Sequence, residues 1–598
     1  MAAVLLFAES YSSNTKEQEI QFFINETTAV KCWKDNDKGI TYVFLPSFAE
    51  LSTTTASIPV GANVSLDGKK LTGKINCSEF NWNREYLFEV DGCSSGVLVF
   101  LHSDNISTIC ITTVNESSLK LVHGDKEHKE YVDITMFSSS GDIIYQGDSR
   151  DQIRGHGNST WRSEKKPYNL YLENPAILTG SQASDKWTLL SNPSDATNLR
   201  NKVVFDFAKK TGRYSWFSPE NEYIDLYING EYYGLYLLCE HVERTAAKLF
   251  DDVNNDSWIL YQYELTWRLN EDDRLVDPYG EGIEIMLPKQ YTEEDVAILL
   301  DNLAAIYQKD ESKEIEEQQR EEAALAHVDL DSWCRKYLIE EAFCNADSGK
   351  ASQIFILDKK NGKTYAGPCW DYDQSLGKMR SVIWWSPNTF WASQGTVYRD
   401  IIQTETAQEY ILELYRKEFS PALHTLISEE LGRYIQLIRS AARMNLIRWS
   451  KVYDDASDNM ENFISFLSDR VEFLDRVWID GCKFYTIRFA GFYASSLCVV
   501  EGDSVFLPDP TEFALPEDSV WIREDTGEEY ALYQENLTEN IVLRALVPEE
   551  KHSQDDAADE KPKSENVSIR MKITIASLVL LSALLVVLFI IDSWRSRG

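Results

Sequence analysis

Two short acidic segments contain the residues of this chain that are best suited to chemistry. Asn345-Ala346-Asp347 ends a segment with helical periodicity, and Trp370-Asp371-Tyr372-Asp373 follows an apolar, strand-like run. In an extended chain, alternation places Asp371 and Asp373 on the same side. Two carboxylates that converge in apolar surroundings need a cation or a proton to relieve their repulsion, and Mg²⁺ prefers one or two carboxylates together with substrate phosphates. Turn capping, which involves no chemistry, would use the same residue types.

A glycine-containing polar segment could hold phosphate groups. It runs from Arg154 to Trp161 with the sequence RGHGNSTW, and Lys165 and Lys166 follow it. Backbone N–H donors and hydroxyl groups in a loop, with positive charges nearby, are what a polyphosphate requires. Arg200, in the polar segment NLRN, adds another cation. A plain surface loop has a similar composition, so both interpretations stay open at this point.

The common motifs of several enzyme classes are absent from the sequence. There is no G-x-x-x-x-G-K-[ST], no G-x-G-x-x-G after a strand, no H-E-x-x-H and no G-x-S-x-G. The eight histidines are scattered along the chain. Any catalysis therefore depends on a less common arrangement of residues.

The composition excludes some classes of protein. The chain has 598 residues, of which 59 are Lys or Arg and 96 are Asp or Glu, and its net charge is −37. Such acidity argues against binding to the nucleic-acid backbone, which requires clustered positive charge. It does not exclude nucleotides, whose phosphates can be held by a few residues and a divalent cation. With 43% apolar and 12% aromatic residues, the bulk of the chain is expected to be folded.

The order of the expected elements indicates an α+β centre between β-rich flanks. Short apolar or alternating runs separated by turn residues predict a β-sandwich-like module near the amino-terminal end. In the centre, strands come first, including a hairpin around Asn229-Gly230, and helices dominate from about Glu293. These changes divide the chain into an amino-terminal module (1–125), a central domain (126–480), a β-rich module (481–547), a flexible acidic tether (548–572), an apolar helix (573–591) and a short tail (592–598).

The apolar helix is predicted to cross a membrane. Ile573–Ile591 is an uncharged run of 19 residues, enough for a hydrocarbon core of about 30 Å. The basic residues that flank it favour a cytoplasmic body, but large domains translocate largely regardless of such charges. Met1–Ala8 resembles the end of a secretory signal. We expect a single-pass membrane protein with an extracellular body, and the orientation stays open.

The ten cysteines do not form a familiar metal or redox motif. No C-x-x-C pair is present, so zinc-ribbon and thioredoxin-like sites are not expected. The cysteines suit either disulfides outside the cell or buried thiols. Cys482 and Cys498 flank an expected hairpin and are the best candidates for a disulfide.

Seven segments of the chain resemble the CotH kinase family, the atypical protein kinases related to spore-coat protein H. In the family's order, these segments are RGHGNSTW, KKPYNLYL, KWTLLSN, NLRN, NGEYYGLYLLCEHVE, EAFCNAD and GPCWDYDQSLG. The resemblance covers roughly Tyr131–Asp480. It implies an α+β fold with an atypical protein-kinase-like catalytic domain, here flanked by the β-rich modules and followed by one C-terminal transmembrane helix. It also implies transfer of the γ-phosphoryl group of ATP to protein Ser/Thr hydroxyl groups, with Mg²⁺ or Mn²⁺.

The resemblance assigns roles to the acidic residues. Asp347 matches the family's catalytic aspartate, which would orient or deprotonate the acceptor hydroxyl group, and Asp371 matches an aspartate that would hold the metal ion. Asp373 is expected to assist Asp371. Many relatives carry an asparagine after the catalytic aspartate as a second metal ligand, and here only Ser352 or Gln353 could replace it. This departure puts full activity in doubt.

The resemblance also suggests residues that bind the nucleotide. Arg154 and either Lys165 or Lys166 fall where the family contacts phosphates, and the choice between the two lysines stays open. Asn158 of the polar loop and Arg200 are further candidates for cofactor binding.

One more candidate and two rival functions complete the expectations. Glu240, at the end of the strand GLYLLCE, is a candidate for ion pairing or nucleotide contact. The expected partners are a protein substrate and, through the C-terminal helix, a membrane, but no nucleic acid. The alternatives are a weakly active or inactive surface adhesion or scaffold protein, and an enzyme that transfers a nucleotidyl group to protein.

Overall fold

The computed structural model describes residues 20–58, 62–90, 93–250, 257–269, 274–307, 317–378, 386–453, 455, 457–492 and 496–547. These residues form two compact units: those up to Phe506 with Tyr533–Ile541, and Leu507–Leu532 with those from Val542 on. The signal-like start, the tether, the predicted transmembrane helix at 573–591 and the tail lie outside the described residues. No helix in the described ranges has the length and apolar character needed to cross a membrane.

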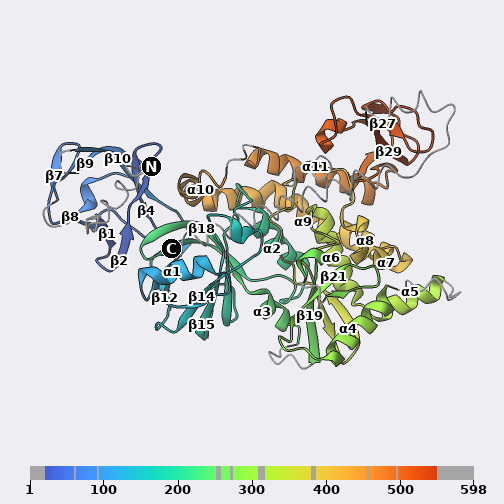
Figure 1. Ribbon diagram of the computed structural model, residues 1–598, viewed down its shortest axis with the longest axis horizontal. Helices are drawn as coiled ribbons and strands as arrows, with labels where there is room; N and C mark the ends of the chain where they lie inside the picture. Colours follow the sequence, from blue (N-terminus) through green and yellow to red (C-terminus); the bar gives the residue numbers. More distant parts are fainter. Residues whose placement is uncertain are drawn as a thin grey trace, which may run out of the picture. The chain divides into compact units, whose positions relative to one another are not determined.

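The larger unit begins with two β-sheets that share an apolar core (Figure 1). The strand orders are β2-β1-β5-β8 and β3-β4-β10-β9-β6-β7. Alternation fits these strands: in β6, Val64 and Leu66 are buried and Ser65 between them is partly exposed. The strands are β1 (Gln21–Ile24), β2 (Thr28–Lys31), β3 (Trp33–Asp35), β4 (Ile40–Leu45), β5 (Thr54–Ser57), β6 (Val64–Leu66), β7 (Lys69–Leu71), β8 (Lys74–Asn76), β9 (Glu85–Val90) and β10 (Cys93–His102). We call residues 20–106 the N-module.

An eight-stranded sheet follows and closes on itself. Its order is β11-β17-β18-β16-β15-β14-β12-β13, and β11 also pairs with β12, so seven strands form a ring around a core of their own. The strand β11, in the range that the sequence assigned to the first module, therefore belongs to this sheet. The strands are β11 (Ser107–Thr113), β12 (Glu130–Phe137), β13 (Ile143–Gln146), β14 (Asp151–Gly155), β15 (Tyr168–Ala176), β16 (Ser184–Leu190), β17 (Asn221–Ile228) and β18 (Glu231–Glu240). The helices in this part are α1 (Glu116–Gly124), α2 (Arg200–Thr211) and α3 (Val242–Ala247).

A five-stranded sheet and most of the helices form the rest of the central domain around the largest core. The order of the sheet is β20-β21-β19-β22-β23. Its strands are β19 (Trp258–Glu264), β20 (Leu275–Val276), β21 (Gly282–Leu287), β22 (Gln353–Asp358) and β23 (Lys363–Ala366). The helices are α4 (Glu293–Ile306), α5 (Glu317–Ala326), α6 (Leu330–Ala342), α7 (Thr396–Ile402), α8 (Glu405–Leu414), α9 (Ser420–Thr425), α10 (Leu431–Arg448) and α11 (Met460–Trp478).

The predicted hairpin at Asn229-Gly230 is confirmed. It joins β17 to β18, and both turn residues have positive φ, 52° and 79°. A turn of this kind matches the twist of the strands that it connects and favours Asn-Gly. A side chain at Gly230 would also meet the carbonyl oxygen of Ala29 at 2.9 Å. The turn therefore needs glycine both for its backbone and for its contact with the N-module.

The two acidic segments follow regular elements, as expected, but Asp371 is not in a strand. Asp347 lies after α6, which begins at the side chain of Asp329 capping Ser332 N. Asp371 follows β23 and has a φ of +64°, which an aspartate tolerates better than most residues. Both carboxylates do line the same cleft, as alternation predicted. The extended backbone from which this was predicted is not observed at Asp371.

The expected disulfide between Cys482 and Cys498 is absent, and both residues are free thiols. In the hairpin of β24 (Phe484–Phe489) and β25 (Ser496–Val500), Thr486 lies opposite Cys498. Cys482 is four residues before Thr486, about 13 Å along a strand, whereas a disulfide needs Cα atoms within about 7 Å. The strand register thus keeps the two thiols apart.

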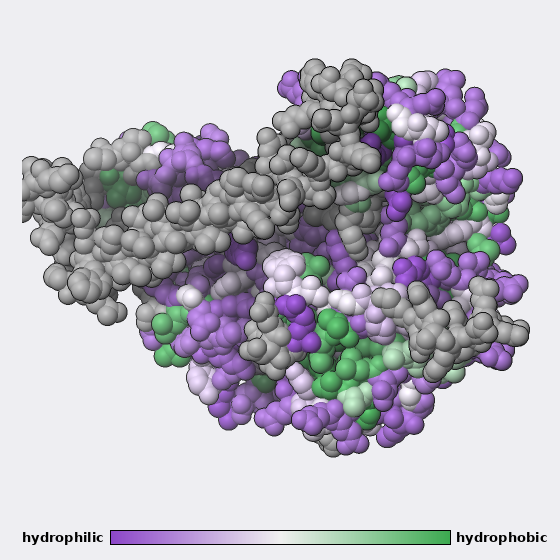
Figure 2. Space-filling view, turned by 45° about the vertical axis from the view of Figure 1, so that its right-hand side comes forward, coloured by the Kyte–Doolittle hydropathy of each residue, from purple (hydrophilic) through white to green (hydrophobic). Residues whose placement is uncertain are grey.

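The remaining strands are short. In the larger unit, β26 (Ser504–Phe506) pairs with β28 (Tyr533–Glu535). In the smaller unit, β27 (Val520–Arg523) pairs with Leu543–Leu546 of β29 (Ile541–Leu546), and Trp521 of β27 is buried. The described surface seen in Figure 2 is mostly hydrophilic, with hydrophobic residues gathered in a few areas.

Candidate active site

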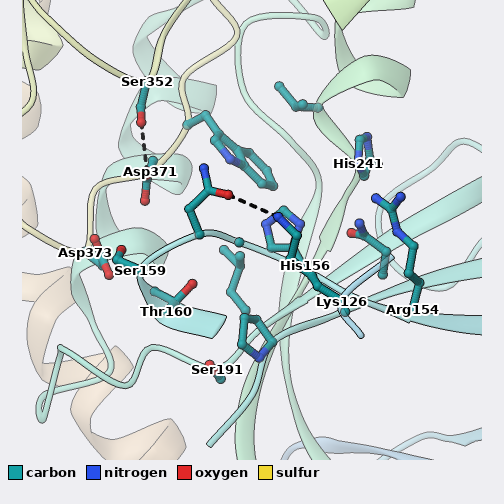
Figure 3. Close-up of a pocket in the computed structure, with 18 of the residues that line it drawn as sticks. Lys126, Arg154, His156, Ser159, Thr160, Ser191, His241, Ser352, Asp371 and Asp373 are labelled. Atoms are coloured by element: carbon teal, nitrogen blue, oxygen red, sulfur yellow. Dashed lines mark hydrogen bonds between the residues drawn. The ribbon is translucent and has the colours of Figure 1, made fainter. Parts of the chain in front are cut away.

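A cleft of about 510 Å³ is lined by residues of both the closed sheet and the five-stranded sheet (Figure 3). Asn169 of β15 and Lys186 of β16 come from the first, and Glu264 of β19 and Glu284 of β21 from the second. Segments that connect the strands complete the lining. The cleft therefore collects side chains that are far apart in the sequence.

The three predicted acidic residues meet in this cleft. Asp347, Asp371 and Asp373 all line it. The hydroxyl group of Ser352 donates to Asp371 Oδ2 at 3.0 Å, and that of Ser194 donates to Asp373 Oδ2 at 2.5 Å. One oxygen of each carboxylate is thus held by a hydroxyl group.

The acidic residues are poised to take up a cation or a proton. Burial, and then the neighbouring Asp373, raises the pKa of Asp371, and burial also raises the pKa of Asp373. Burial raises the pKa of Asp347 to about 6, although Lys350 opposes the shift. Carboxylates that raise one another's pKa in this way favour a bound cation between them.

The segment between β14 and β15 supplies hydroxyl and amide groups to the cleft. Ser159 and Thr160 lie on the same side as Asp373 in Figure 3, and all three also line an adjoining cavity. Gly157 has a φ of +76°, and a side chain there would meet the Thr160 hydroxyl group at 2.2 Å. Asn158 lines the cleft and accepts a hydrogen bond from Lys126 Nζ at 3.1 Å. The glycine is required by this tight loop.

Five lysine and arginine side chains line the cleft, and of these only Arg154 was predicted from the sequence. It pairs with Glu127 at 2.6 Å. The other four are Lys126, Lys129, Lys186 and Lys289. In the view of Figure 3, Lys126 and Arg154 lie on the opposite side from Asp371 and Asp373.

Lys186 and Glu243 form an ion pair that the sequence did not reveal. Lys186 Nζ donates to Glu243 Oε2 at 2.7 Å, and both side chains are largely buried. Lys289 reaches the other oxygen of Glu243 at 2.8 Å. Burial opposes ionisation of Glu243, but the two lysines outweigh it and lower the pKa of the carboxyl group. The only sequence signal was the position of Lys186 in KWTLLSN, one of the segments of the resemblance.

Two histidines in the cleft are neutral near pH 7. Burial lowers the pKa of His156 to about 3 and that of His241 well below its usual value. His241 Nδ1 accepts a hydrogen bond from the backbone of Glu243 at 3.3 Å and so caps α3. Positive charge in the cleft therefore comes from lysine and arginine.

Neither Lys165 nor Lys166, both predicted to contact phosphates, lines the cleft. The Nζ atom of Lys165 is buried and donates to the carbonyl oxygen of Leu235 at 2.7 Å and to the hydroxyl group of Tyr453 at 3.1 Å. That of Lys166 donates to the carbonyl oxygen of Trp161 at 2.8 Å. Both lysine side chains therefore form hydrogen bonds within the protein. Lys186 lines the cleft in their place.

Arg200 and Glu240 also lie outside the lining of the cleft. Arg200 is buried at the start of α2 and pairs with Asp195 at 2.5 Å and Asp458 at 2.8 Å. Glu240 pairs with Lys248 at 2.6 Å. Each of these predicted cofactor contacts is instead a buried ion pair close to the cleft.

Gln353, the predicted replacement for the family's asparagine, is buried and does not line the cleft. Its Oε1 accepts from the hydroxyl group of Tyr398 at 2.6 Å, and its Nε2 donates to the carbonyl oxygen of Ala351 at 3.3 Å. Ser352, the other residue considered, does line the cleft and contacts Asp371. Of the two, only Ser352 lies where it could approach a metal ion held by Asp371.

A buried glutamate connects the two acidic segments. Glu340 of α6 accepts from the hydroxyl group of Tyr372 at 2.6 Å and from Asn345 Nδ2 at 2.8 Å, and it pairs with Lys336. Tyr372 stands between Asp371 and Asp373 in the sequence, and Asn345 Oδ1 accepts from the backbone of Asp347 at 3.2 Å. The Glu340 carboxylate thus holds both acidic segments, one through Tyr372 and the other through Asn345.

The lining suits a phosphate-bearing ligand and a divalent cation. Arg154 Nε and the hydroxyl oxygen of Ser191 are buried and, among the described residues, lack a hydrogen-bond partner, and both residues line the cleft. In the same ranges no three His, Cys, Asp or Glu side chains are arranged to hold a metal ion by themselves. A cation held by Asp371 and Asp373 would therefore need oxygen atoms of its ligand, which is the usual arrangement for Mg²⁺ with phosphates.

A family model described as "CotH kinase protein" matches residues 153–474, more than half of the chain. No curated protein matches the sequence. Among solved structures, the crystal structure of a Helicobacter pylori proinflammatory kinase, CtkA, is similar with 9% sequence identity and a TM-score of 0.19. The match covers 52% of this chain and 90% of that one, and a likeness this distant carries no weight for the assignment.

Proposed function

The chain belongs to the CotH kinase family, and we propose that it transfers the γ-phosphoryl group of ATP to serine or threonine hydroxyl groups of an acceptor protein. The observation that carries this proposal is the composition of the cleft, where cations and donors without a partner among the described residues accompany three aspartates with raised pKa values. Phosphoryl transfer needs little covalent chemistry from the protein, because positioning and neutralisation of charge supply most of the catalysis.

The cationic side of the cleft would bind the phosphates of the nucleotide. Lys186 is fixed by Glu243, so its ammonium group is oriented before the ligand arrives. Arg154 and Ser191 offer donors that have no partner among the described residues. Lys126 and Asn158, which are hydrogen-bonded to each other, line the same cleft. A lysine held by a glutamate is also the usual phosphate-binding pair of protein kinases.

Asp371 and Asp373 would hold Mg²⁺ or Mn²⁺, with Ser352 beside Asp371. When bound, the metal ion neutralises the charge on the phosphate oxygens. The protein contributes two carboxylates whose repulsion is relieved by that charge, and hydroxyl groups that donate hydrogen bonds to them. Glu340, through Tyr372, keeps this segment in place.

Asp347 would orient the acceptor hydroxyl group and accept its proton. With a pKa of about 6, its side chain is mostly ionised at pH 7 and still basic enough to take up a proton. Asn345 supports its backbone. The two sets of acidic residues therefore divide the work between charge neutralisation and proton transfer.

The proposal is tested by intact-mass analysis of the full chain after incubation with ATP and Mg²⁺ or Mn²⁺, with dephosphorylated casein as the acceptor. Asp371→Asn should abolish Mg–ATP binding in calorimetry, whereas Asp347→Asn should retain binding and lose transfer. The matched control is Asp301→Asn, on the exposed face of α4, which should behave as the wild type.

The mass added to the protein or to casein separates the possible functions. Phosphate-sized additions that disappear in Asp347→Asn support a kinase. Nucleotide-sized additions would support nucleotidyl transfer instead. If no mass is added and ATP does not bind, an adhesion or scaffold role becomes the better explanation.

Anchoring of the body to a membrane through residues 573–591 stays a separate prediction. Fractionation of cells that express the full chain or a chain ending at residue 572 tests it. Recovery of both chains in the same fraction would contradict it.

A further inference from the structure

The cleft continues into two further cavities that lead to the N-module. A cavity of 460 Å³ shares Ser159, Thr160 and Asp373 with the cleft. A third cavity, of 310 Å³, shares Glu164 and Lys451 with the second. It is also lined by Trp33, Asp35 and Asp37 of the N-module. We call the second and third cavities together the outer groove.

The far end of the outer groove is built from three parts of the chain. The guanidinium group of Arg448 lies over the rings of Trp33 and Trp449, at 5.2 and 4.2 Å from their centroids. Arg448 also donates to Glu231 Oε1 at 2.8 Å, close to the turn between β17 and β18. The N-module, the end of α10 and the closed sheet thus meet at one arginine.

Further contacts fix the N-module against the closed sheet. The backbone of Lys31 donates to the carbonyl oxygen of Gly230 at 2.8 Å. The hydroxyl group of Tyr227 donates to the carbonyl oxygen of Phe44 at 3.2 Å, and the rings of Phe44 and Tyr232 lie 4.9 Å apart. The outer groove is therefore part of the folded unit.

The charges along the outer groove are placed to recognise a charged side chain. Glu164 lines both cavities, and within the described ranges it forms no ion pair or side-chain hydrogen bond. Lys451 lies on the same stretch. It is paired with Asp37 at 2.9 Å, and its charge is attracted more weakly by Glu164. The carboxylate of Glu164 is thus the group left for a ligand in the segment that the two cavities share.

We propose that the outer groove binds an extended segment of the acceptor polypeptide, with Glu164 selecting a positively charged residue at one position beside the phosphorylated serine or threonine. The inference rests on the proposed kinase function and adds the class of the acceptor. The groove begins at Asp373, a proposed metal ligand that lines the same cleft as Asp347, and it leads out of the cleft. A small acceptor would occupy only the cleft, whereas an extended polypeptide, at about 3.3 Å per residue, reaches along a groove of this kind.

The proposal is tested with a peptide library that has one fixed serine and randomised positions on both sides, phosphorylated by the full chain with Mg–ATP. The wild type should prefer Lys or Arg at one flanking position by about threefold or more. An exposed ion pair contributes up to about 1 kcal/mol, which is enough for such a preference. Glu164→Lys should reverse that preference toward Asp or Glu. Asp37→Lys, in the N-module, should change the selection at a position farther from the serine.

The control is Glu409→Lys, the same substitution on the exposed surface of α8, which should select the wild-type peptides. Mg–ATP binding by each variant verifies its folding. Phosphorylation without selection beside the serine, or selection unchanged in Glu164→Lys, would overturn the inference and leave the proposed function standing. The absence of both phosphorylation and Mg–ATP binding in the wild type would overturn the two together.

Discussion

A proton must leave the acceptor hydroxyl group, and the ionisation of Asp347 predicts how the rate depends on pH. Its pKa, raised by burial to about 6, is that of the free protein, and kcat/KM reports groups of the free enzyme. As the pH falls below about 6, Asp347 becomes protonated and cannot accept the proton. We therefore expect kcat/KM for the acceptor to fall about tenfold per pH unit on this acid side.

Steady-state rates between pH 4.5 and 8 measure this dependence. ATP and the acceptor are kept well below their KM values so that the free protein is the form that titrates, and calorimetry at each pH measures any change in nucleotide binding. The Asp347→Asn variant should have a residual rate without this acid limb. A wild-type rate that stays constant down to pH 5 would show that Asp347 is not the base.

The two candidate phosphate lysines can be distinguished by one substitution each. Lys186→Met should weaken ATP binding about 10- to 100-fold, because a hydrogen bond to a charged group is worth about 1.5–3 kcal/mol. Lys166→Met should change it less than about threefold, since Lys166 Nζ contacts the carbonyl oxygen of Trp161 and not the cleft. Calorimetric titration with Mg–ATP measures both. The reverse order of effects would restore the sequence prediction.

At the scale of residues, the sequence predicted the acidic part of the site better than its cationic part. Two short sequence motifs contain Asp347, Asp371 and Asp373, and each aspartate can be recognised from its neighbours in the sequence. All three line the cleft. Lys186 becomes recognisable only through Glu243, which is 57 residues away in the sequence. A lysine beside a glycine-containing loop, such as Lys166, is the natural choice when such long-range pairs are invisible.

At the scale of elements, α6 is expected to set the geometry of the acidic cluster. Glu340→Gln removes the charge that pairs with Lys336 and weakens the hydrogen bonds to Tyr372 and Asn345. We expect both the affinity for Mg–ATP and kcat to fall about tenfold, because small displacements of catalytic groups are costly. Calorimetry and rates at saturating ATP measure the two effects separately.

The neighbouring Glu341 provides a matched control on the same helix. It is also fully buried and ion-paired, but its partners are Arg470 and the backbone of Trp391. Glu341→Gln should lower the thermal stability and leave kcat of the folded protein unchanged. If both variants lose stability alone, Glu340 is a structural residue without a role in positioning.

Elements with local signals were predicted, and their long-range pairing was not. The hairpin at Asn229-Gly230 has a turn signal between alternating strands, and the structure confirms it. The closed sheet could not be predicted. Its closure depends on β11, which pairs with β12 and also with β17, and β17 lies more than a hundred residues farther along the chain. For the same reason the sequence assigned β11 to the preceding module.

At the scale of the whole molecule, the N-module is joined to the closed sheet by a buried polar and apolar junction. Asp225 of β17 accepts hydrogen bonds from Ser103 and from the hydroxyl group of Tyr232. Tyr227 and Tyr232 belong to the same apolar core as Phe44 of the N-module. A module that shares its core with the catalytic domain is expected to unfold with it, since separating the two would expose these buried groups.

Calorimetric scans of the full chain test this cooperativity. Mg–ATP at about 100 times its Kd stabilises the part that binds it by about 2.7 kcal/mol, and the transition that includes the N-module should move to higher temperature with it. Phe44→Ala, which empties a fully buried site in the N-module, should cost about 3–5 kcal/mol and lower that same transition. A transition from the smaller unit is recognised because neither change moves it. A contrary result would be two transitions, one moved only by Mg–ATP and the other only by Phe44→Ala. The N-module would then fold independently, and the outer groove would join two parts that can separate.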